Sequence, residues 1–254
     1  MKKIQDCTVH NIKNLNKDTY ILELKCPKIP EHISAGNFAE IRVDHSAEVF
    51  LRRPLSVYNV DYKNQLISFF IKIVGKGTAL LQEVKKGEIV NIIYPLGNSY
   101  GTKQSGKVLV IGGGSGIAPL LLLGKELKES GAEITYLLGG RTSGDIHLIE
   151  DFKQYGTVNF TTEDGSLVEK GRVTDHTIFK KISEFSKIYT CGPDPMMKAI
   201  GKIAQQYKIP CEVSLENMMA CGFGACLCCI TETHEGNKCV CTEGPVFNVN
   251  DLKW

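Results

Sequence analysis

Short hydrophobic runs separated by polar turns fill the N-terminal part of the chain. Runs rich in β-branched and aromatic residues recur at Thr19–Leu24, Phe38–Val43, Leu55–Val60, Leu66–Ile73 and Glu88–Ile93. Several short strands at this spacing are typical of an antiparallel β-barrel. We therefore predict a barrel domain over residues 1–101, with one short helix at Gly77–Val84.

The pattern changes after a linker at Lys103–Gly106. Continuous apolar strands now alternate with segments of helical periodicity, and helices are expected at Ala118–Glu129 and Asp194–Tyr207. The expected strands are Lys107–Ile111, Ile134–Leu138, Val158–Thr161, Ile188–Cys191 and Cys211–Leu215. Alternation of this kind predicts a parallel sheet with flanking helices, joined by right-handed crossovers. This α/β domain should extend over residues 106–216.

The last segment, residues 217–254, is too short for an apolar core of its own and contains six of the ten cysteines. Cys221, Cys226 and Cys229 follow the spacing C-x4-C-x2-C, which is typical of a [2Fe–2S] cluster when a further cysteine follows. We therefore expect this segment to fold around its metal.

Six cysteines offer more candidates than the four ligands that such a cluster needs. Gly222 and Gly224 allow the first loop to wrap tightly with its amide groups turned inward. Neighbouring residues of an extended chain point to opposite sides, so we choose Cys229 over Cys228. The spacing does not choose between Cys239 and Cys241 for the fourth ligand.

Two other readings of the cysteines stay open. Four cysteines also suit a structural zinc site, which would make the segment a zinc-stapled binding module without redox activity. Zinc ribbons, however, usually have two C-x2-C knuckles, and this chain has one. Disulfides are typical of small secreted domains in an oxidising compartment. Iron–sulfur binding agrees best with the spacing.

Composition narrows the function classes. A net charge of +2 is too balanced for a nucleic-acid-binding surface. The first residues lack the apolar run of an export signal, and no stretch is long enough to span a membrane. We therefore expect a protein of the reducing cytoplasm. The remaining cysteines are expected to be packed thiols; they are Cys7, Cys26, Cys191 and Cys211.

A glycine-rich turn follows the first strand of the α/β domain. Glycines here let the backbone approach a pyrophosphate, and the next helix offers its N-terminal amides, although a simple tight turn is the alternative. A second segment of small residues, Cys191–Pro193, lies at the end of the later strand Ile188–Cys191. Ligands of parallel sheets bind beyond the carboxyl ends of the strands. The predicted nucleotide-binding residues are Gly112, Gly113, Gly114, Gly116, Cys191, Gly192 and Pro193.

The barrel domain holds a candidate phosphate site at Arg52–Ser56. An arginine fork binds phosphate through two parallel hydrogen bonds, and the hydroxyl of Ser56 can add another. Gly75–Thr78, before the short helix, is a second possible phosphate cradle.

In this order, the motifs resemble those of the ferredoxin–NADP reductase family of flavoproteins. More closely, the chain resembles the electron-transfer subunits of NAD-dependent, two-subunit (class 1B) dihydroorotate dehydrogenases. The segments that carry the resemblance are Arg52–Ser56, Pro95–Asn98, Ile111–Gly114, Tyr189–Gly192, Met219–Cys226 and Cys241–Phe247.

The resemblance implies FAD in the barrel, a [2Fe–2S] cluster in the C-terminal segment and NAD on the α/β domain. The residues that it assigns to FAD are Arg53, Pro54, Leu55, Ser56, Phe70, Ile71, Lys72, Gly77 and Thr78. It also implies Cys241 as the fourth cluster ligand, because the family's ligand precedes the Gly-Pro-Val-Phe run.

The implied function is an electron relay in pyrimidine (UMP) biosynthesis. An FMN-containing catalytic subunit would oxidise dihydroorotate, and this chain would pass the electrons through the cluster and FAD to NAD⁺. The assembly implied is a heterotetramer of two relay and two catalytic chains.

Two positions depart from the family pattern. Lys72 stands where arginine is more common, and Arg141 follows the second α/β strand, where it could meet the 2′-phosphate of NADP. A reductase subunit of a ferredoxin- or sulfide-linked NAD(P) oxidoreductase, and a free-standing flavin reductase, are alternatives on the same scaffold.

Overall fold

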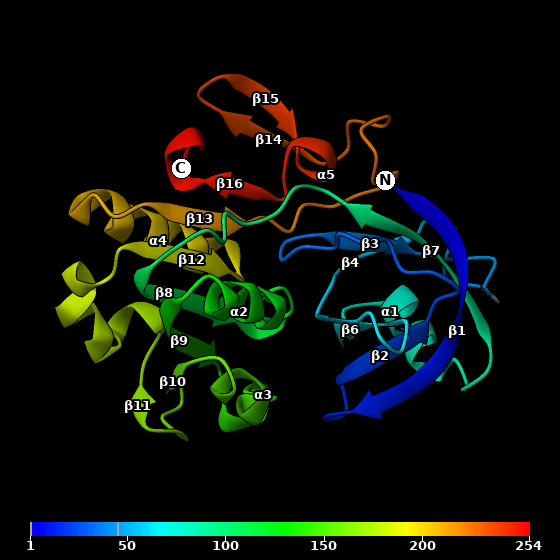
Figure 1. The fold of residues 1–254 in the computed structure, drawn as a ribbon, viewed down its shortest axis with the longest axis horizontal. Helices are drawn as coiled ribbons and strands as arrows, with labels where there is room; N and C mark the ends of the chain where they lie inside the picture. Colours follow the sequence, from blue (N-terminus) through cyan, green and yellow to red (C-terminus); the bar gives the residue numbers. More distant parts are fainter. Residues whose placement is uncertain (1, 45) are drawn as a thin grey trace.

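The computed structural model of the protein describes residues 2–44 and 46–254. Two sheets stand side by side, and a small hairpin lies at the end nearest both chain termini (Figure 1). This arrangement confirms the predicted barrel and α/β parts.

The first sheet is antiparallel and has seven strands in the order β4-β3-β7-β1-β2-β6-β5. Its strands are β1 (Lys3–Asn14), β2 (Thr19–Lys25), β3 (Phe38–Ile41), β4 (Arg53–Ser56), β5 (Asn59–Asp61), β6 (Leu66–Lys72) and β7 (Ile89–Leu96). Helix α1 (Lys76–Glu83) follows β6.

Two details of the barrel differ from the sequence-based expectation. Strand β1 was not predicted, because its sequence is mostly polar and it buries only Cys7 and Val9. It pairs with both β2 and β7, so its backbone is fixed by neighbours on each side. The predicted strand Leu55–Val60 is two strands, β4 and β5, which pair with different neighbours.

The second sheet has the order β11-β10-β9-β8-β12-β13-β16, and all of its pairs are parallel except the last. Its strands are β8 (Gly106–Gly113), β9 (Ala132–Gly140), β10 (Thr157–Thr162), β11 (Glu169–Lys170), β12 (Lys187–Cys191), β13 (Cys211–Ser214) and β16 (Val246–Asn248). The α-helices are α2 (Leu120–Glu129), α3 (Ile149–Lys153) and α4 (Asp194–Tyr207). Helix α4 has the predicted bounds.

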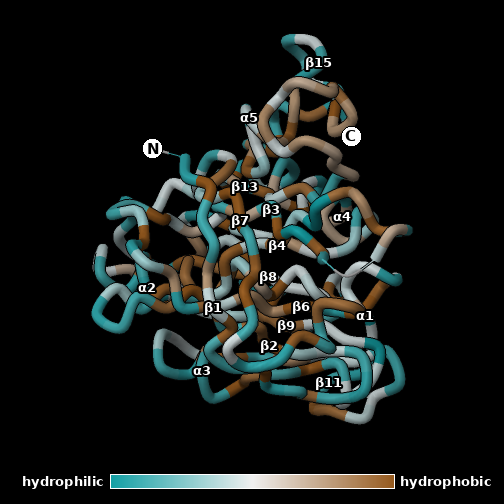
Figure 2. The backbone as a smooth tube through the Cα atoms, turned by 90° about the vertical axis from the view of Figure 1, so that its right-hand side faces the viewer, coloured by the Kyte–Doolittle hydropathy of each residue, from teal (hydrophilic) through white to brown (hydrophobic). Residues whose placement is uncertain are grey.

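Alternate residues of the central strand β8 point to opposite faces of the sheet, as strand geometry requires. Val108 and Val110 join one hydrophobic core, which contains the inside of the barrel and helix α2. Leu109 and Ile111 join the other core, which contains helix α4 and the C-terminal segment. Both cores also take residues from the other parts of the chain: Phe38 and Leu96 of the barrel belong to the second core, and Val246 of the C-terminal segment belongs to the first. In Figure 2 the hydrophobic segments gather along the central strands, while the tip near β15 is hydrophilic.

The cysteine segment is anchored to the α/β sheet. It forms the hairpin β14 (Ile230–Thr233) and β15 (Gly236–Cys239), then α5 (Val240–Glu243). Strand β16 adds antiparallel to β13, and Phe247 and Leu252 are buried in the core of helix α4. The segment therefore shares the apolar core of the α/β domain.

One expectation about the cysteines is wrong. Cys7 and Cys26 form a disulfide, with their Cα atoms 4.4 Å apart, whereas packed thiols were predicted. The reason is the β1–β2 register: Thr8 lies opposite Lys25, so the next pair outward is Cys7 and Cys26. Directly opposite residues of antiparallel strands approach closely enough for this bond. Cys191 and Cys211 are buried free thiols, as expected.

Within the described residues, none of the helices combines the length and the hydrophobicity needed to span a bilayer.

Candidate flavin, nucleotide and iron–sulfur sites

A cavity of about 310 Å³ lies where the barrel, the α/β sheet and the C-terminal segment meet. Strands β4 and β6 and the start of helix α1 form its barrel wall. The predicted flavin residues in this wall are Arg53, Pro54, Leu55, Ser56, Phe70, Lys72 and Thr78. Residues far apart in the sequence thus share one surface, as the resemblance implies.

Two predicted flavin residues lie outside the cavity lining. Ile71 alternates with Phe70 and Lys72 along β6, so its side chain is buried in the barrel core. Gly77 lies directly against the side chain of Arg53. A Cβ atom at position 77 would overlap the Nε atom of Arg53. Glycine at 77 therefore allows the guanidinium to lie across the start of helix α1.

The start of helix α1 is an ordered turn. The hydroxyl oxygen of Thr78 accepts hydrogen bonds from the backbone N–H of Val74 at 3.0 Å and of Gly75 at 3.4 Å. The hydroxyl of Tyr20 donates to the carbonyl of Thr78 at 2.7 Å. A helix start and an arginine side chain together present the positive potential that a pyrophosphate requires.

The opposite wall of the cavity includes Glu216, which the sequence analysis missed. Its side chain reaches solvent through the cavity yet is closely surrounded by protein. Burial, followed by the charge of Asp194, raises the pKa of Glu216. The signal in the sequence was its place just after β13, because ligands of parallel sheets bind beyond the carboxyl ends of strands.

A second cavity, of about 490 Å³, opens at the carboxyl ends of β8, β9 and β10. Gly113, Gly114 and Pro193 line it, as predicted for nucleotide-binding residues. Lys72 lines both cavities, so the candidate flavin and nucleotide sites adjoin at this side chain.

The other predicted nucleotide residues lie where the carboxyl ends of β8 and β12 pack closely together. Cys191 lies opposite Gly112 in the parallel pairing of β12 with β8, and it is fully buried. A Cβ atom at Gly116 would overlap the backbone of Cys191, and one at Gly192 would lie 2.9 Å from the carbonyl oxygen of Gly113. These glycines permit close backbone packing of the two strand ends, and the residues that do not themselves line the cavity are Gly112, Gly116, Cys191 and Gly192.

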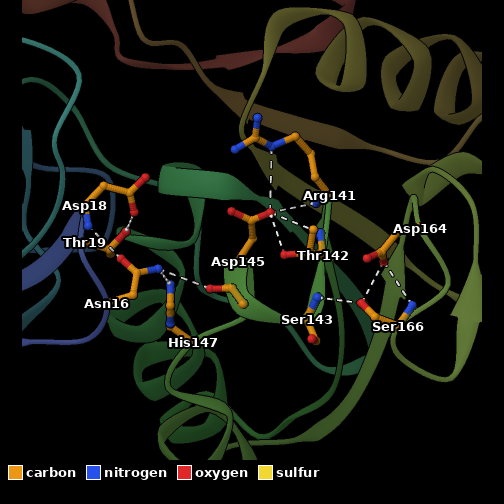
Figure 3. A network of polar contacts seen from close by, with 11 residues as sticks. Asn16, Asp18, Thr19, Arg141, Thr142, Ser143, Asp145, His147, Asp164 and Ser166 are labelled. Atoms are coloured by element: carbon orange, nitrogen blue, oxygen red, sulfur yellow. Dashed lines mark hydrogen bonds and ion pairs between the residues drawn. The ribbon is translucent and has the colours of Figure 1, made fainter.

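Arg141 lies at the rim of the nucleotide cavity, next to a carboxylate. Asp145 accepts hydrogen bonds from the backbone N–H groups of Arg141 and Thr142, each at 3.1 Å, and lies 3.8 Å from Nε of Arg141 (Figure 3). Glu163 and Arg172 also line this cavity and were missed by the sequence analysis. The rim therefore carries charges of both signs.

A contact between the barrel and the α/β domain holds the loop that follows Arg141. The side-chain amide of Asn16, between β1 and β2, donates to the carbonyl of Gly144 at 3.2 Å and lies 3.1 Å from Nε2 of His147 (Figure 3). His147 also lies beside Phe70, with 6.1 Å between the ring centroids. The barrel thus holds the loop that rims the nucleotide cavity.

The first cysteine loop has the inward-turned amides that its glycines suggested. Burial acts to raise the pKa of Cys221, but hydrogen bonds from the backbone N–H groups of Phe223, Cys226 and Ala225 prevail and lower it to about 6. Gly222 and Gly224 have φ values of +74° and +89°, which favour glycine. The loop is therefore built to hold a thiolate.

The other thiols lie around Cys229. The backbone N–H of Cys241 donates to Sγ of Cys229 at 3.4 Å, and both residues are buried. Burial and the neighbouring Cys229 raise the pKa of Cys241 to about 12 and also raise that of Cys239. Cys228 is exposed.

The predicted ligands thus stand as two groups, Cys221 with Cys226 and Cys229 with Cys241. Across residues 2–44 and 46–254, no three His, Cys, Asp or Glu side chains are arranged together as a metal-binding group. The four cysteines nevertheless fit an iron–sulfur cluster. The backbone N–H groups of the loop around Cys221 can donate hydrogen bonds to the sulfur atoms of such a cluster.

The flavin cavity and the cysteine loop are connected directly. Met218 and Met219 line the cavity, and Cys221 follows after one further residue. Two residues of extended chain span at most about 7 Å, so a cluster held at Cys221 would lie beside the cavity wall.

Glu40 lies at the same junction. It is fully buried on β3, and its register partner on β4 is Pro54 in the cavity wall. Burial raises the pKa of Glu40 to about 7, with the charge of Arg52 acting in the opposite direction. Neither of its carboxyl oxygens has a hydrogen-bond partner.

Comparison with protein families divides the chain in the same way. Residues 6–100 match an oxidoreductase FAD-binding domain, and residues 110–202 match an oxidoreductase NAD-binding domain. Residues 216–253 match the iron–sulfur cluster binding domain of dihydroorotate dehydrogenase B.

Full-length relatives agree. The chain is 35% identical over 261 residues to the electron transfer subunit of dihydroorotate dehydrogenase B (NAD(+)) from Fusobacterium nucleatum subsp. nucleatum, and 99% of each chain is covered. It belongs to this family of electron transfer subunits. The relative from Shouchella clausii is 36% identical over 259 residues, covering 99% of this chain and 98% of that one.

As a member of this family, the chain has FAD-binding, NAD-binding and iron–sulfur domains. A solved NADH-dependent reduced ferredoxin-NADP oxidoreductase, studied for flavin-based electron bifurcation, superposes with a TM-score of 0.89 at 30% identity. That match covers 98% of this chain and 90% of the other. A ferredoxin reductase of carbazole 1,9a-dioxygenase shares the fold with a TM-score of 0.70 at 22% identity, over 82% of this chain and 67% of that one.

Proposed function

We propose that this chain relays electrons from the FMN of a dihydroorotate dehydrogenase catalytic subunit to NAD⁺. The route runs through a [2Fe–2S] cluster and FAD, and the reaction serves pyrimidine biosynthesis. Dihydroorotate oxidation itself belongs to the partner chain. The single observation that supports this best is the short connection from the cavity wall at Met219 to Cys221.

Residues of the barrel bind FAD, and residues at the end of β8 bind the dinucleotide. Arg53 and the start of helix α1 bind the FAD pyrophosphate, while Pro54, Leu55, Ser56 and the backbone and side chains of β6 hold the ring system. Gly113 and Gly114 receive the dinucleotide at the carboxyl end of β8. When bound, FAD and the cluster together convert single-electron transfer into hydride chemistry.

Cys221, Cys226, Cys229 and Cys241 are proposed as the cluster ligands. Cys241 is favoured over Cys239 because it is buried and its N–H points at Cys229, whereas the N–H of Cys239 donates to Glu243 at 2.7 Å. Closing the site requires the two groups of thiolates to move together around the metal.

The chain also has a proposed assembly and a proposed cellular compartment. Two relay chains and two catalytic chains form a heterotetramer in the cytoplasm, and NAD(H) is the soluble substrate. Eight free cysteines support a reducing compartment, and the disulfide between Cys7 and Cys26 is the observation against it.

The proposal is tested on full-length chain purified anaerobically. We expect bound FAD, iron and acid-labile sulfide, NADH-dependent reduction of an artificial electron acceptor, and no orotate formation from dihydroorotate. Adding the FMN-containing catalytic chain should produce dihydroorotate-dependent reduction of NAD⁺. Orotate formation by the isolated chain, or absence of iron, would contradict the proposal.

A second candidate function is supported by the reduced ferredoxin-NADP oxidoreductase match over 98% of the chain. Such a chain would serve a ferredoxin-linked partner in place of a dihydroorotate dehydrogenase. Co-purification from the native host separates the two, because it identifies the partner chain directly.

A further inference from the structure

The carboxyl group of Glu40 has no role in the sites described so far. Its side chain is 0% exposed, and both Oε1 and Oε2 lack hydrogen-bond partners. A buried polar group without partners costs free energy on the order of 1–3 kcal/mol, and more when it is charged. Such a group points to an interaction that is made only when a neighbouring site is complete.

The neighbouring site is the first cysteine loop. A Cβ atom on Gly222 would lie 2.5 Å from Cγ and 2.8 Å from Oε1 of Glu40, so the Gly222 backbone packs directly against this carboxyl group. Gly222 has a φ of +74°, and a side chain at this position is excluded by both conformation and space. Cys221, the first proposed ligand, immediately precedes it.

The other neighbours tie Glu40 to the flavin wall. Strand β3 pairs with β4 so that Glu40 lies opposite Pro54, and with β7 so that it lies opposite Ile93. The guanidinium of Arg52 donates to the backbone carbonyl of Glu40 at 3.2 Å. One residue of a rigid strand therefore touches the cluster loop and adjoins the strand that lines the flavin cavity.

We propose that Glu40 is a positioning residue of the iron–sulfur site, holding the Gly222 loop against the flavin wall and placing negative charge beside the cluster. The proposal rests on the proposed function, since it presumes a cluster at Cys221. Loop amides that turn toward the carboxyl group when the four thiolates close around the metal would satisfy its oxygens. The carboxylate would then lower the reduction potential of the cluster relative to that of a neutral residue.

The test uses full-length chain reconstituted with FAD, iron and sulfide. Glu40→Gln keeps the size and an acceptor oxygen but removes the charge, whereas Glu40→Ala removes the contact as well. Glu126→Gln is the control, because Glu126 is a half-buried carboxyl group on α2 that accepts from the backbone N–H of Ala35 at 2.8 Å, away from the cysteines. The readouts are FAD and iron content, the cluster potential from an EPR-monitored redox titration at about pH 8.5, where carboxyl groups are ionised, and iron release to a chelator.

We expect Glu40→Gln to retain both cofactors and to shift the equilibrium toward reduced cluster about tenfold, which is about 59 mV for one electron. Glu40→Ala should release iron about 10- to 100-fold faster, as is typical when groups that support metal ligands are removed. Glu126→Gln should match the wild type in both measurements.

Three outcomes would overturn the inference: a wild-type potential in Glu40→Gln, wild-type iron release in Glu40→Ala, or the same shift in Glu126→Gln. Each of these presupposes that the wild-type chain holds a cluster. A wild-type chain that takes up no iron would refute the proposed function, so the two failures are distinguished.

Discussion

The candidate flavin cavity is walled by paired strands and a helix start, whereas three of the four proposed cluster ligands lie in one loop and the fourth, Cys241, lies in the single-turn helix α5. Strands β4 and β6 are held by ladder hydrogen bonds to β3, β2 and β5, which do not depend on any cofactor. The loop from Cys221 to Cys229 contains no helix or strand, and its proposed ligands stand in two separate groups.

The two candidate cofactor sites should therefore respond differently to mutation. Removing one flavin contact leaves the strands in place, so the loss is limited to that contact. Removing one thiolate removes part of what organises the loop, because metal binding and folding are coupled in such segments.

The largest effect is expected for Cys226→Ser. We expect near-complete loss of iron with retention of FAD, because the hydroxyl is a poor substitute for a thiolate ligand while the barrel is untouched. Iron analysis and the visible spectrum measure both. Cys228→Ser is the matched control and should keep its iron. Iron retention in Cys226→Ser would show that the ligand set is wrong.

Anchoring of the cysteine segment predicts the next effect. Phe247 on β16 is 6% exposed in the core shared with helix α4, so Phe247→Ala should destabilise the protein by about 3–5 kcal/mol. Urea unfolding measures the change. Phe50 is 85% exposed, and Phe50→Ala should stay within about 0.5 kcal/mol of wild type. Equal effects of the two substitutions would refute the anchoring role of β16.

A smaller, local effect is expected for Arg53→Ala. Losing a charged hydrogen-bond donor costs about 1.5–3 kcal/mol, which corresponds to roughly 10- to 150-fold weaker FAD binding. Iron content should not change. Titration of the apoprotein with FAD gives the affinity, and Arg42→Ala, which removes an exposed arginine paired with Asp44, serves as the control. Loss of iron together with FAD would show that the two sites are not independent.

The smallest effect concerns pH. Burial is the main cause that lowers the pKa of His147, so the unfolded chain binds more protons than the folded chain in the range just below the ordinary pKa of histidine. Stability should therefore fall as the pH drops through this range. His147→Gln should reduce that dependence, measured by thermal unfolding at a series of pH values. An unchanged pH profile in His147→Gln would mean that the burial of His147 does not cause this loss of stability.

Most of the fold could be predicted from local sequence patterns. Hydrophobic periodicity located helix α4 at its observed bounds and most strands to within two or three residues, because buried elements must repeat with their structural period. The glycine-rich run after the first α/β strand pointed to the turn whose Gly113 and Gly114 line the second cavity, and cysteine spacing pointed to the loop from Cys221 to Cys229. The resemblance of short motifs correctly indicated the family.

Which distant residues meet depends on strand pairing and packing, and local patterns do not predict it. Strand β1 was missed because pairing on both edges, more than apolar sequence, holds it in place. The disulfide between Cys7 and Cys26 depends on strand register, which no local pattern encodes. Glu40, Glu216 and Lys72 gain their surroundings from segments more than a hundred residues away or from a second domain. Burial, charge and close approach are properties of the packed chain, and for this reason the junction between the flavin wall and the cysteine loop became visible only in three dimensions.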